Sequence, residues 1–334
     1  MNEYGYDEFF LQFAKNYPNL FIARIISKST NIYKAVCENG EVLAEISGKF
    51  RHEASTLSDY PTVGDFVLLD RNNNNLGNAI IHKVLKRKSA FARKAAGKTP
   101  NEQVIAANID TIFICMSLNN DFNIRRLERY LSIAWESGAV PVIVLTKSDL
   151  CKNLEEMLSE VEAVAFGVDI LVTSSESENG YLDVFNYAKE AQTIAFIGSS
   201  GVGKSTLINK LLGRDLLNTN TTDEHDKGRH TTTKSNIIKI LNGALVIDTP
   251  GLREVGIEFS DLEKTFADVE ELSKHCKFND CTHTKEPACA VKKAIEDKTL
   301  SRERLLNYQK LQREATYAEK KNQIRRLKEN KRKK

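Results

Sequence analysis

Residues 192–213, QTIAFIGSSGVGKSTLINKLLG, decide the fold of the central part of this chain. An apolar, strand-like run leads into a glycine-rich loop, and an amphipathic helical pattern follows. The loop satisfies G-x-x-x-x-G-K-[ST], a pattern in which backbone N–H groups and a helix N-terminus surround phosphate oxygens. It predicts a nucleotide phosphate site formed by Gly198, Ser199, Ser200, Gly201, Val202, Gly203, Lys204, Ser205 and Thr206. Lys204 is expected to contact the β- and γ-phosphates, and Ser205 is expected to ligate Mg²⁺.

An acidic motif follows at residues 248–251, DTPG, directly after the apolar run ALVID. An acid at the end of a strand beside a phosphate loop is a typical partner of Mg²⁺. We therefore expect Asp248 near the metal ion and the backbone N–H of Gly251 near the γ-phosphate.

The stretch VIVLTKSDL, residues 142–150, identifies the base. Thr-Lys-x-Asp is close to the Asn-Lys-x-Asp of guanine-binding proteins, and the predicted contacts come from Thr146, Lys147, Ser148 and Asp149. Asp149 can accept hydrogen bonds from guanine N1–H and the exocyclic amine, a donor pair that adenine lacks. Ser174 and Ser175, at the end of the next strand, resemble the loop that offers N–H groups to guanine O6. Thr146 has a shorter reach than Asn, so we expect an altered tether to the phosphate loop and a modest affinity.

Between the phosphate loop and DTPG lies a Thr-rich polar segment, DKGRHTTTKS, at residues 226–235. We expect it to be a switch loop in which Thr232 approaches Mg²⁺ and the γ-phosphate, with Thr231 and Thr233 as open alternatives. Many GTPases orient the attacking water with a Gln directly after D-x-x-G, but Leu252 stands there. His230 is the candidate for that catalytic role, and an exposed loop histidine is the equal alternative.

Strand and helix patterns alternate from residue 109 to 258, which predicts an α/β domain with a mostly parallel sheet. Helices are expected over residues 123–138, 153–166 and about 181–191. The base-reading motif precedes the phosphate loop, opposite to the usual order. The sequence therefore predicts a circularly permuted P-loop GTPase domain, in which every strand keeps its neighbours.

The flanks of this domain differ from it. Residues 1–19 predict a short amphipathic helix ended by Pro18, as an N-terminal extension. Short alternating segments over residues 20–88, with a hairpin signal at Asn39-Gly40, predict a small β-barrel. Residues 89–108 are expected to be a basic linker. Residues 259–334 predict a mainly helical domain with a basic tail that is either a solvated helix end or a phosphate-binding arm.

A metal-binding pattern interrupts the C-terminal helices. Cys276-x4-Cys281-x-His283-x5-Cys289 supplies three thiolates and one imidazole, a set that suits tetrahedral structural Zn²⁺. His275 competes as a ligand, but its position next to Cys276 would strain the chelate. The remaining cysteines of the six, Cys37, Cys115 and Cys151, are scattered and are interpreted as reduced thiols.

Composition is consistent with a soluble, cytoplasmic protein. The 334 residues are 41% hydrophobic and 28% charged, with a net charge of +3. The sequence shows neither a secretory signal nor an apolar run of the ~20 residues that cross a bilayer, so no membrane partner is expected. We expect a monomer.

Together these motifs resemble the circularly permuted GTPases of the ribosome small-subunit-dependent GTPase A type. The resemblance covers nearly the whole chain and includes AEISGKFRHEA, VGDFVLLD, RRLERYLSIAWESGA, GRHTTT and CKFNDCTHTKEPACAV. It implies an OB-fold as the barrel, a zinc-binding C-terminal domain, GTP hydrolysis to GDP, and binding to the small ribosomal subunit and its rRNA late in maturation.

Two other functions fit parts of the sequence. The chain could be an rRNA-binding scaffold with a regulatory nucleotide site and negligible hydrolysis, which Leu252 permits and the intact Lys204, Ser205 and Asp248 oppose. It could also be an ATP-using enzyme, which Asp149 opposes. GTP and ATP turnover with and without small ribosomal subunits distinguishes the three.

Overall fold

The computed structural model describes most of the chain, namely residues 1–94, 102–177, 179–214, 235–248, 265–278, 280–313 and 316. Contacts between residues divide the chain into two compact units. Unit 1 comprises Met1–Phe122, Ser137–Leu154 and Val168–Gly256, and unit 2 comprises Asn123–Glu136, Glu155–Gly167 and Ile257–Lys334. Unit 1 therefore contains the predicted barrel and the phosphate loop, whereas unit 2 contains the predicted metal ligands.

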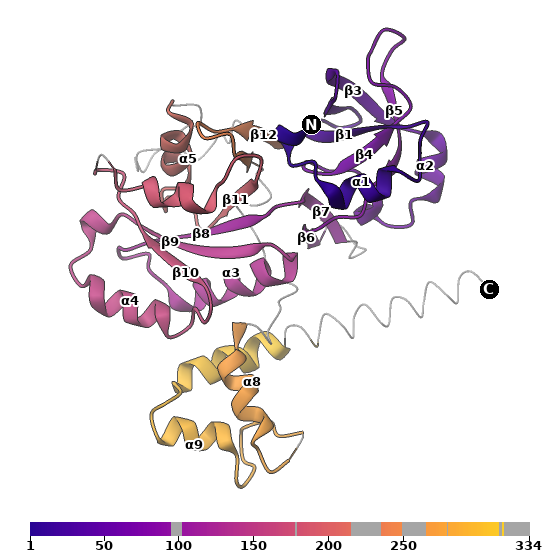
Figure 1. The fold of residues 1–334 in the computed structure, drawn as a ribbon. Coiled ribbons are helices and arrows are strands. Elements are labelled where there is room, and N and C mark those ends of the chain that lie inside the picture. Colours follow the sequence, from indigo (N-terminus) through magenta and orange to yellow (C-terminus); the bar gives the residue numbers. More distant parts are fainter. Residues whose placement is uncertain are drawn as a thin grey trace. The chain divides into compact units, whose positions relative to one another are not determined.

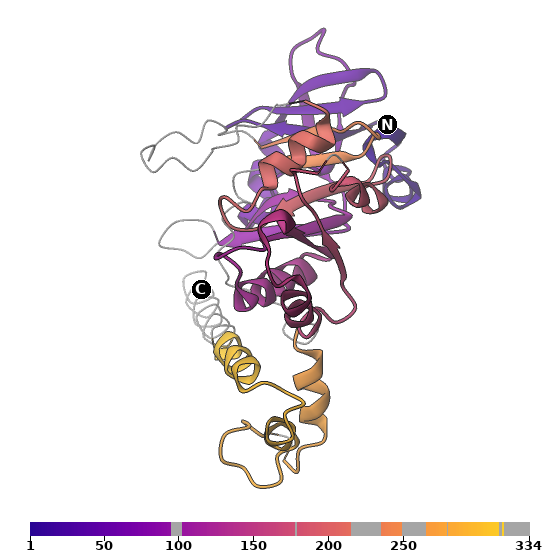
Figure 2. The ribbon, with the colours of Figure 1, turned by 90° about the vertical axis from the view of Figure 1, so that its left-hand side faces the viewer.

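Five strands near the N-terminus form a closed barrel, and they lie side by side in both views (Figure 1, Figure 2). They are β1 (Phe21–Lys28), β2 (Tyr33–Cys37), β3 (Gly40–Ile46), β4 (Phe66–Leu69) and β5 (Ala79–Val84). They pair in the order β1-β2-β3-β5-β4, and β4 pairs back with β1. The β3–β5 pair is parallel and the other pairs are antiparallel. The ring confirms the predicted barrel, with the five strands of the expected OB-fold.

The N-terminal segment packs against this barrel. It contains the 3₁₀ helix η1 (Asn2–Tyr4) and the helix α1 (Glu8–Ala14). Asp7 caps α1, and the ring of Phe10 lies 3.9 Å from that of Phe66 on β4, measured between centroids. The predicted helix is present, but it ends before Pro18 is reached. Two further short helices, α2 (Gly48–Glu53) and η2 (Leu57–Asp59), lead from β3 to β4.

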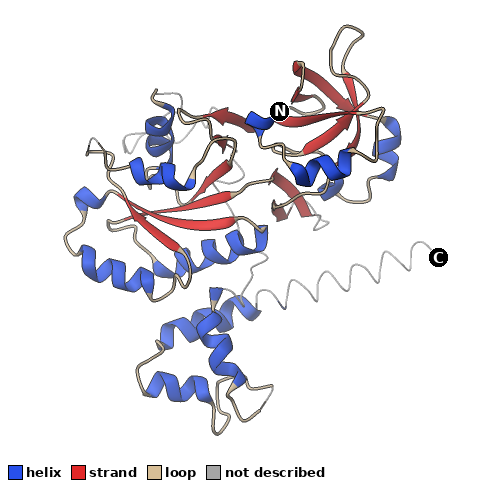
Figure 3. Ribbon diagram, in the orientation of Figure 1, coloured by secondary structure: helices blue, strands red, loops and turns tan. Residues whose placement is uncertain are grey.

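A two-stranded hairpin occupies the segment predicted as a linker (Figure 3). Its strands are β6 (Ala90–Lys94) and β7 (Glu102–Ala107). The hydroxyl of Thr62 donates to the carbonyl of Ile105 at 3.1 Å, and Ala107 N–H donates to the carbonyl of Val63 at 3.0 Å. The linker prediction missed these strands because they flank a basic stretch, and because their burial depends on contacts with the distant chain before β4.

The central sheet has six strands in the order β10-β9-β8-β11-β13-β12. They are β8 (Thr111–Ser117), β9 (Val140–Thr146), β10 (Asp169–Val172), β11 (Thr193–Ile197), β12 (Ser235–Lys239) and β13 (Leu245–Asp248). Neighbouring strands are parallel except β12, which is antiparallel to β13. Every residue of β8 and β11 is buried, which explains their continuous apolar runs. The predicted α/β domain with a mostly parallel sheet is confirmed.

Helical segments connect these strands. They are α3 (Ile124–Ser137), η3 (Ser148–Leu150), α4 (Leu154–Glu162), η4 (Leu182–Tyr187) and α5 (Lys204–Leu212). On α5, Leu207, Ile208 and Leu211 are buried in a core that also contains the stacked rings of Phe113 and Phe196. The helix expected over about 181–191 is the short 3₁₀ helix η4, so that prediction was wrong in helix type and length.

The barrel and the sheet are joined within unit 1. The last residues of β1 pair with the first residues of β12, with Ser27 opposite Asn236. Arg24 is buried, and its guanidinium donates to the carbonyl of Asn108 at 3.2 Å and to the hydroxyl of Thr193 at 2.8 Å. It also donates to the carbonyl of Tyr4 at 2.6 Å. Burial lowers the pKa of Arg24 to about 10. One side chain therefore connects the N-terminal segment, the barrel and the sheet.

Unit 2 has its own core, formed by helices α8 (Ala267–Lys274), α9 (Ala290–Glu296) and a helix over residues 302–313. Buried members of this core include Phe266, Val291 and Leu311. The described part of the C-terminal region is mainly helical, as predicted. Among the described residues, no helix combines the length and the apolar composition needed to cross a membrane.

Candidate functional site

The phosphate loop connects β11 to α5. Gly198 and Gly203 have φ angles of 143° and 98°, which favour glycine. A Cβ atom on Gly198 would lie 2.3 Å from the carbonyl oxygen of Cys115 on β8. Lys204 begins α5, and its ammonium donates to the carbonyl oxygens of Gly198 at 2.7 Å and Ser199 at 2.5 Å. The loop is therefore curled around the lysine head group, and the predicted contacts of Lys204 with phosphates stay a prediction.

The other predicted nucleotide contacts lie at the same edge of the sheet. The parallel strands β9, β10, β11 and β13 all end there, and ligands of open α/β sheets bind outside these carboxyl ends. Ser200 and Gly201 are in the loop after β11, while Ser205 and Thr206 are in the first turn of α5. Asp248 is the last residue of β13 and is buried. The topology thus gathers residues that are far apart in sequence.

Thr146 ties the base-reading motif to the phosphate loop. Its hydroxyl oxygen lies 2.5 Å from the carbonyl oxygen of Val202, to which it donates. The next residue, Lys147, has a left-handed backbone with φ of 60°, and its ammonium donates to the carbonyl of Gly201 at 2.7 Å. The shorter threonine side chain therefore does reach the phosphate loop, through a backbone carbonyl.

Asp149 is held by a neighbouring loop. The hydroxyl of Ser174 donates to Asp149 Oδ1 at 2.5 Å, and Ser148 N–H donates to the carbonyl of Thr173 at 3.2 Å. The backbone N–H of Ser174 donates to the carbonyl of Gly180 at 3.2 Å, so it is already engaged. Ser175 follows it in the same loop. Of the two serines expected to offer N–H groups to guanine, Ser174 acts here through its side chain on Asp149.

Six positions discussed above cannot be placed. His230, Thr232 and Gly251 lie outside the described residues, as do the alternatives Thr231 and Thr233 and the position of Leu252. Their roles stay predictions.

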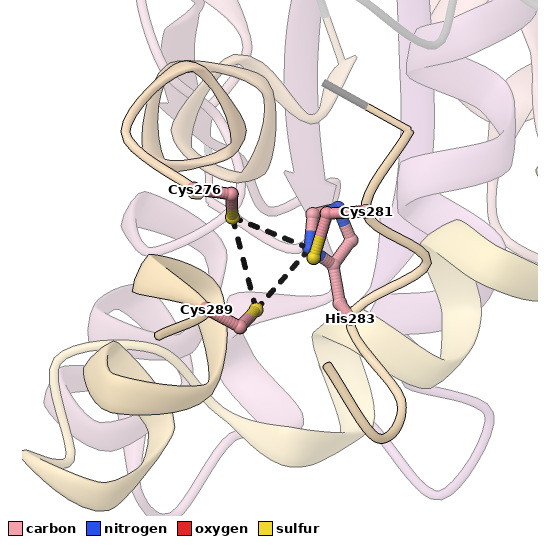
Figure 4. Close-up of side chains that lie close together, drawn as sticks. All are labelled: Cys276, Cys281, His283 and Cys289. Atoms are coloured by element: carbon pink, nitrogen blue, oxygen red, sulfur yellow. Dashed lines mark hydrogen bonds between the residues drawn. The ribbon is translucent and has the colours of Figure 1, made fainter. Parts of the chain in front are cut away.

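The predicted metal ligands form one cluster in unit 2 (Figure 4). The ligand atoms of Cys276, Cys281, His283 and Cys289 all lie within 4.8 Å of one another. The sulfur atoms of Cys276 and Cys289 are 3.7 Å apart, and Nδ1 of His283 is 3.7 Å from the first and 3.4 Å from the second. His275 is outside the cluster, exposed and 3.9 Å from Glu271. His275 therefore does not join the group of side chains that could hold a metal ion.

The separations among Cys276, His283 and Cys289 fit a tetrahedral zinc ion. Zinc bonds of about 2.3 Å to sulfur and 2.0–2.1 Å to nitrogen place tetrahedral ligand atoms roughly 3.5–3.8 Å apart. Burial lowers the pKa of His283 and raises that of Cys281 to about 11. At Cys276, burial raises the pKa, but hydrogen bonds from the N–H groups of Val291 and Ala290 outweigh it, so the net shift is downward. All six cysteines lie among the described residues, and none forms a disulfide.

The chain was compared with known proteins. A family model described as RsgA GTPase matches residues 84–258. A "Small ribosomal subunit biogenesis GTPase RsgA 2" of Lactiplantibacillus plantarum is 51% identical over 298 residues, covering 89% of this chain and 84% of the relative. The chain belongs to the RsgA GTPase family.

A further RsgA relative and two solved structures are similar to this chain over most of its length. An RsgA 1 protein of Listeria innocua is 44% identical over 325 residues, covering 96% of this chain and 91% of the relative. The crystal structure of YjeQ from Thermotoga maritima superposes with a TM-score of 0.65 at 26% identity, covering 89% of this chain and 99% of that one. YloQ, described as a circularly permuted GTPase, gives 0.63 at 26% identity, covering 89% and 95%. The permuted order is thus shared with solved structures.

Two residues that support the metal cluster of this RsgA-family chain were not predicted. Ser273 on α8 lies 3.1 Å from Nε2 of His283. The carboxylate of Glu286 accepts hydrogen bonds from the N–H groups of Thr282 at 3.0 Å and Thr284 at 2.8 Å, on either side of His283. Only the local Thr-x-Thr-x-Glu order, typical of a carboxylate-capped turn, could have indicated Glu286. No spacing in the sequence indicates Ser273.

A buried ionic group holds unit 2 together. The guanidinium of Arg304 donates to Glu128 on α3 at 2.5 Å and to both carboxylate oxygens of Asp268 on α8 at 2.6 and 2.8 Å. Burial raises the pKa of Glu128, although the charge of Arg304 opposes this shift. The helix α3, expected to belong to the GTPase domain, is thus tied to helices of the region that contains the Cys/His cluster.

Proposed function

We propose that this RsgA-family chain is a GTP hydrolase that binds the small ribosomal subunit and acts late in its maturation. The hydrogen bonds from Thr146 and Lys147 to the phosphate loop carry the proposal for the nucleotide, because they set a guanine-reading motif beside a phosphate site. The relatives described as small ribosomal subunit biogenesis GTPases support the choice of partner.

Different residues are proposed to bind the phosphates and the guanine base of GTP. The N–H groups of the phosphate loop and the ammonium of Lys204 would hold the phosphates. Asp149, oriented by the hydroxyl of Ser174, would accept hydrogen bonds from guanine N1–H and the exocyclic amine. The aliphatic part of the Lys147 side chain would lie along the base. Since Ser174 N–H is engaged with Gly180, Ser175 is the better candidate for guanine O6.

Magnesium would be held by Ser205, with Asp248 and Thr232 close by, and would neutralise phosphate charge. With Leu252 in the position after D-x-x-G, His230 is the proposed group that orients water. Turnover is therefore expected to be slow alone and to rise when the subunit binds.

The cluster of Cys276, Cys281, His283 and Cys289 is proposed to hold one structural zinc ion. Four protein ligands leave no open position for catalysis. Purified protein should carry one zinc per chain by elemental analysis without added metal, and a strong chelator should lower its melting temperature. A metal-free protein with an unchanged melting temperature would exclude the site.

The barrel and the basic C-terminal tail are proposed to contact rRNA, so binding should weaken as salt rises. Binding to the small ribosomal subunit would place the protein in the cytoplasm. We also propose that it acts as a monomer.

Hydrolysis of GTP and ATP, each with and without purified small ribosomal subunits, tests the function. GTP turnover that increases on addition of subunits is expected. A flat rate near zero would support the scaffold instead, and preferential ATP turnover would refute guanine specificity.

A further inference from the structure

We propose that Ser273 is the positioning residue of the metal site, which fixes His283 so that Nδ1, rather than Nε2, binds the ion. The inference rests on the proposed zinc site and adds a residue and an atom to it. Nδ1 of His283 faces the sulfur atoms of Cys276 and Cys289 (Figure 4). The other ring nitrogen, Nε2, lies 3.1 Å from the hydroxyl of Ser273.

The hydrogen bond between Ser273 and Val269 determines which atom donates in the hydrogen bond between Ser273 and His283. The hydroxyl of Ser273 lies 2.7 Å from the carbonyl oxygen of Val269, which can only accept. The single hydroxyl proton is therefore committed to Val269, and Ser273 must accept from Nε2–H of His283. A neutral imidazole has one N–H, so Nδ1 keeps the lone pair that a metal requires.

The hydrogen bonds from His283 through Ser273 to Val269 end on a helix that packs in the core of unit 2. Val269 and Ser273 are one turn apart on α8, and Val269 is fully buried in the core of unit 2. His283 itself lies in a loop, with a left-handed φ of 58°, and only 9% of it is exposed. The helix thus supplies a fixed acceptor to a ligand whose own backbone is not in regular structure. Such supporting hydrogen bonds to ligand histidines orient the ring and increase its basicity.

Substitution of Ser273 measures its contribution. Ser273→Ala should weaken zinc affinity by about 10–100-fold in competition with a chromogenic chelator. Ser273→Thr keeps the hydroxyl and should restore most of the affinity. Thr316→Ala is the matched control, because the Thr316 hydroxyl makes the same kind of helix bond, to the carbonyl of Gln312 at 2.8 Å, outside the cluster. Equal affinities of Ser273→Ala and the wild-type protein would overturn the inference.

A second measurement does not depend on how the variant folds. Two-bond ¹H–¹⁵N correlation spectra of the zinc-loaded wild-type protein should show His283 protonated at Nε2 and metal-bound at Nδ1. Binding through Nε2 would refute the proposal. A wild-type protein that takes up no zinc would overturn the zinc site and this inference together, whereas tight zinc binding with an indifferent Ser273 overturns this inference alone.

Discussion

The tether at Thr146 can be tested by Thr146→Val, which removes one hydroxyl and keeps the shape of the side chain. Its bond to the Val202 carbonyl is 2.5 Å long, and the two residues are 5% and 2% exposed, so water can hardly replace it. A buried carbonyl left without a partner costs about 1–3 kcal/mol. The free energy of unfolding should fall by that amount.

Nucleotide affinity should fall as well, by a smaller factor. The bond holds the base-reading loop against the phosphate loop, so without it GTP must itself restore their arrangement. A net hydrogen bond of about 0.5–1.5 kcal/mol corresponds to a loss of roughly two- to tenfold in affinity. The preference for GTP over ATP should persist, because it depends on Asp149.

Titration with a fluorescent GDP analogue and urea unfolding would measure the two effects. Thr146→Ser retains the hydroxyl and should resemble the wild-type protein, while Thr146→Asn tests whether the longer amide raises the affinity. If Thr146→Val kept both the affinity and the stability of the wild-type protein, the bond would not be the link between the two loops.

Three other substitutions test separate parts of the structure. Asp149→Asn should lower GTP affinity at least about a hundredfold in competition against labelled GDP, and an unchanged preference for guanine would contradict its role. Arg304→Met leaves Glu128 buried without its ionic partner and should cost about 3–5 kcal/mol in urea unfolding, whereas substitution of an exposed arginine of the same helix should cost little. Gly198→Ala should abolish nucleotide binding, because its Cβ would lie 2.3 Å from the Cys115 carbonyl; binding at wild-type strength would show that the loop can shift.

Features that depend on neighbouring residues could be predicted from the sequence. The phosphate loop is one such feature, since its glycines and Lys204 belong to a short motif between a strand and a helix. The metal cluster is another, because four ligands within a short segment limit how far apart they can lie. The permuted sheet followed from the order of the motifs, since parallel strands place their ends at one edge.

Features that depend on distant residues could not be predicted. Arg24 donates to Asn108 and Thr193, which are 84 and 169 positions away, and nothing local in its strand indicates either partner. Ser273 contacts His283, which is ten positions away in a loop. Its role as an acceptor depends on the hydrogen bond that its hydroxyl donates to the Val269 carbonyl. The contact of Thr146 with the phosphate loop could not be predicted either, because it depends on tertiary structure. The short threonine side chain contacts the loop because the backbone carbonyl of Val202 lies within hydrogen-bonding distance of its hydroxyl.

The pairing of β1 with β12 matters for any attempt to study the GTPase domain alone. An unpaired strand edge is a template for aggregation, and in this protein the barrel covers that edge of the central sheet where Ser27 faces Asn236. Removing the barrel would expose these backbone groups and would also leave the Asn108 carbonyl and the Thr193 hydroxyl without Arg24. A GTPase domain cut at its apparent boundary should therefore self-associate, and the smallest well-behaved fragment should include the barrel.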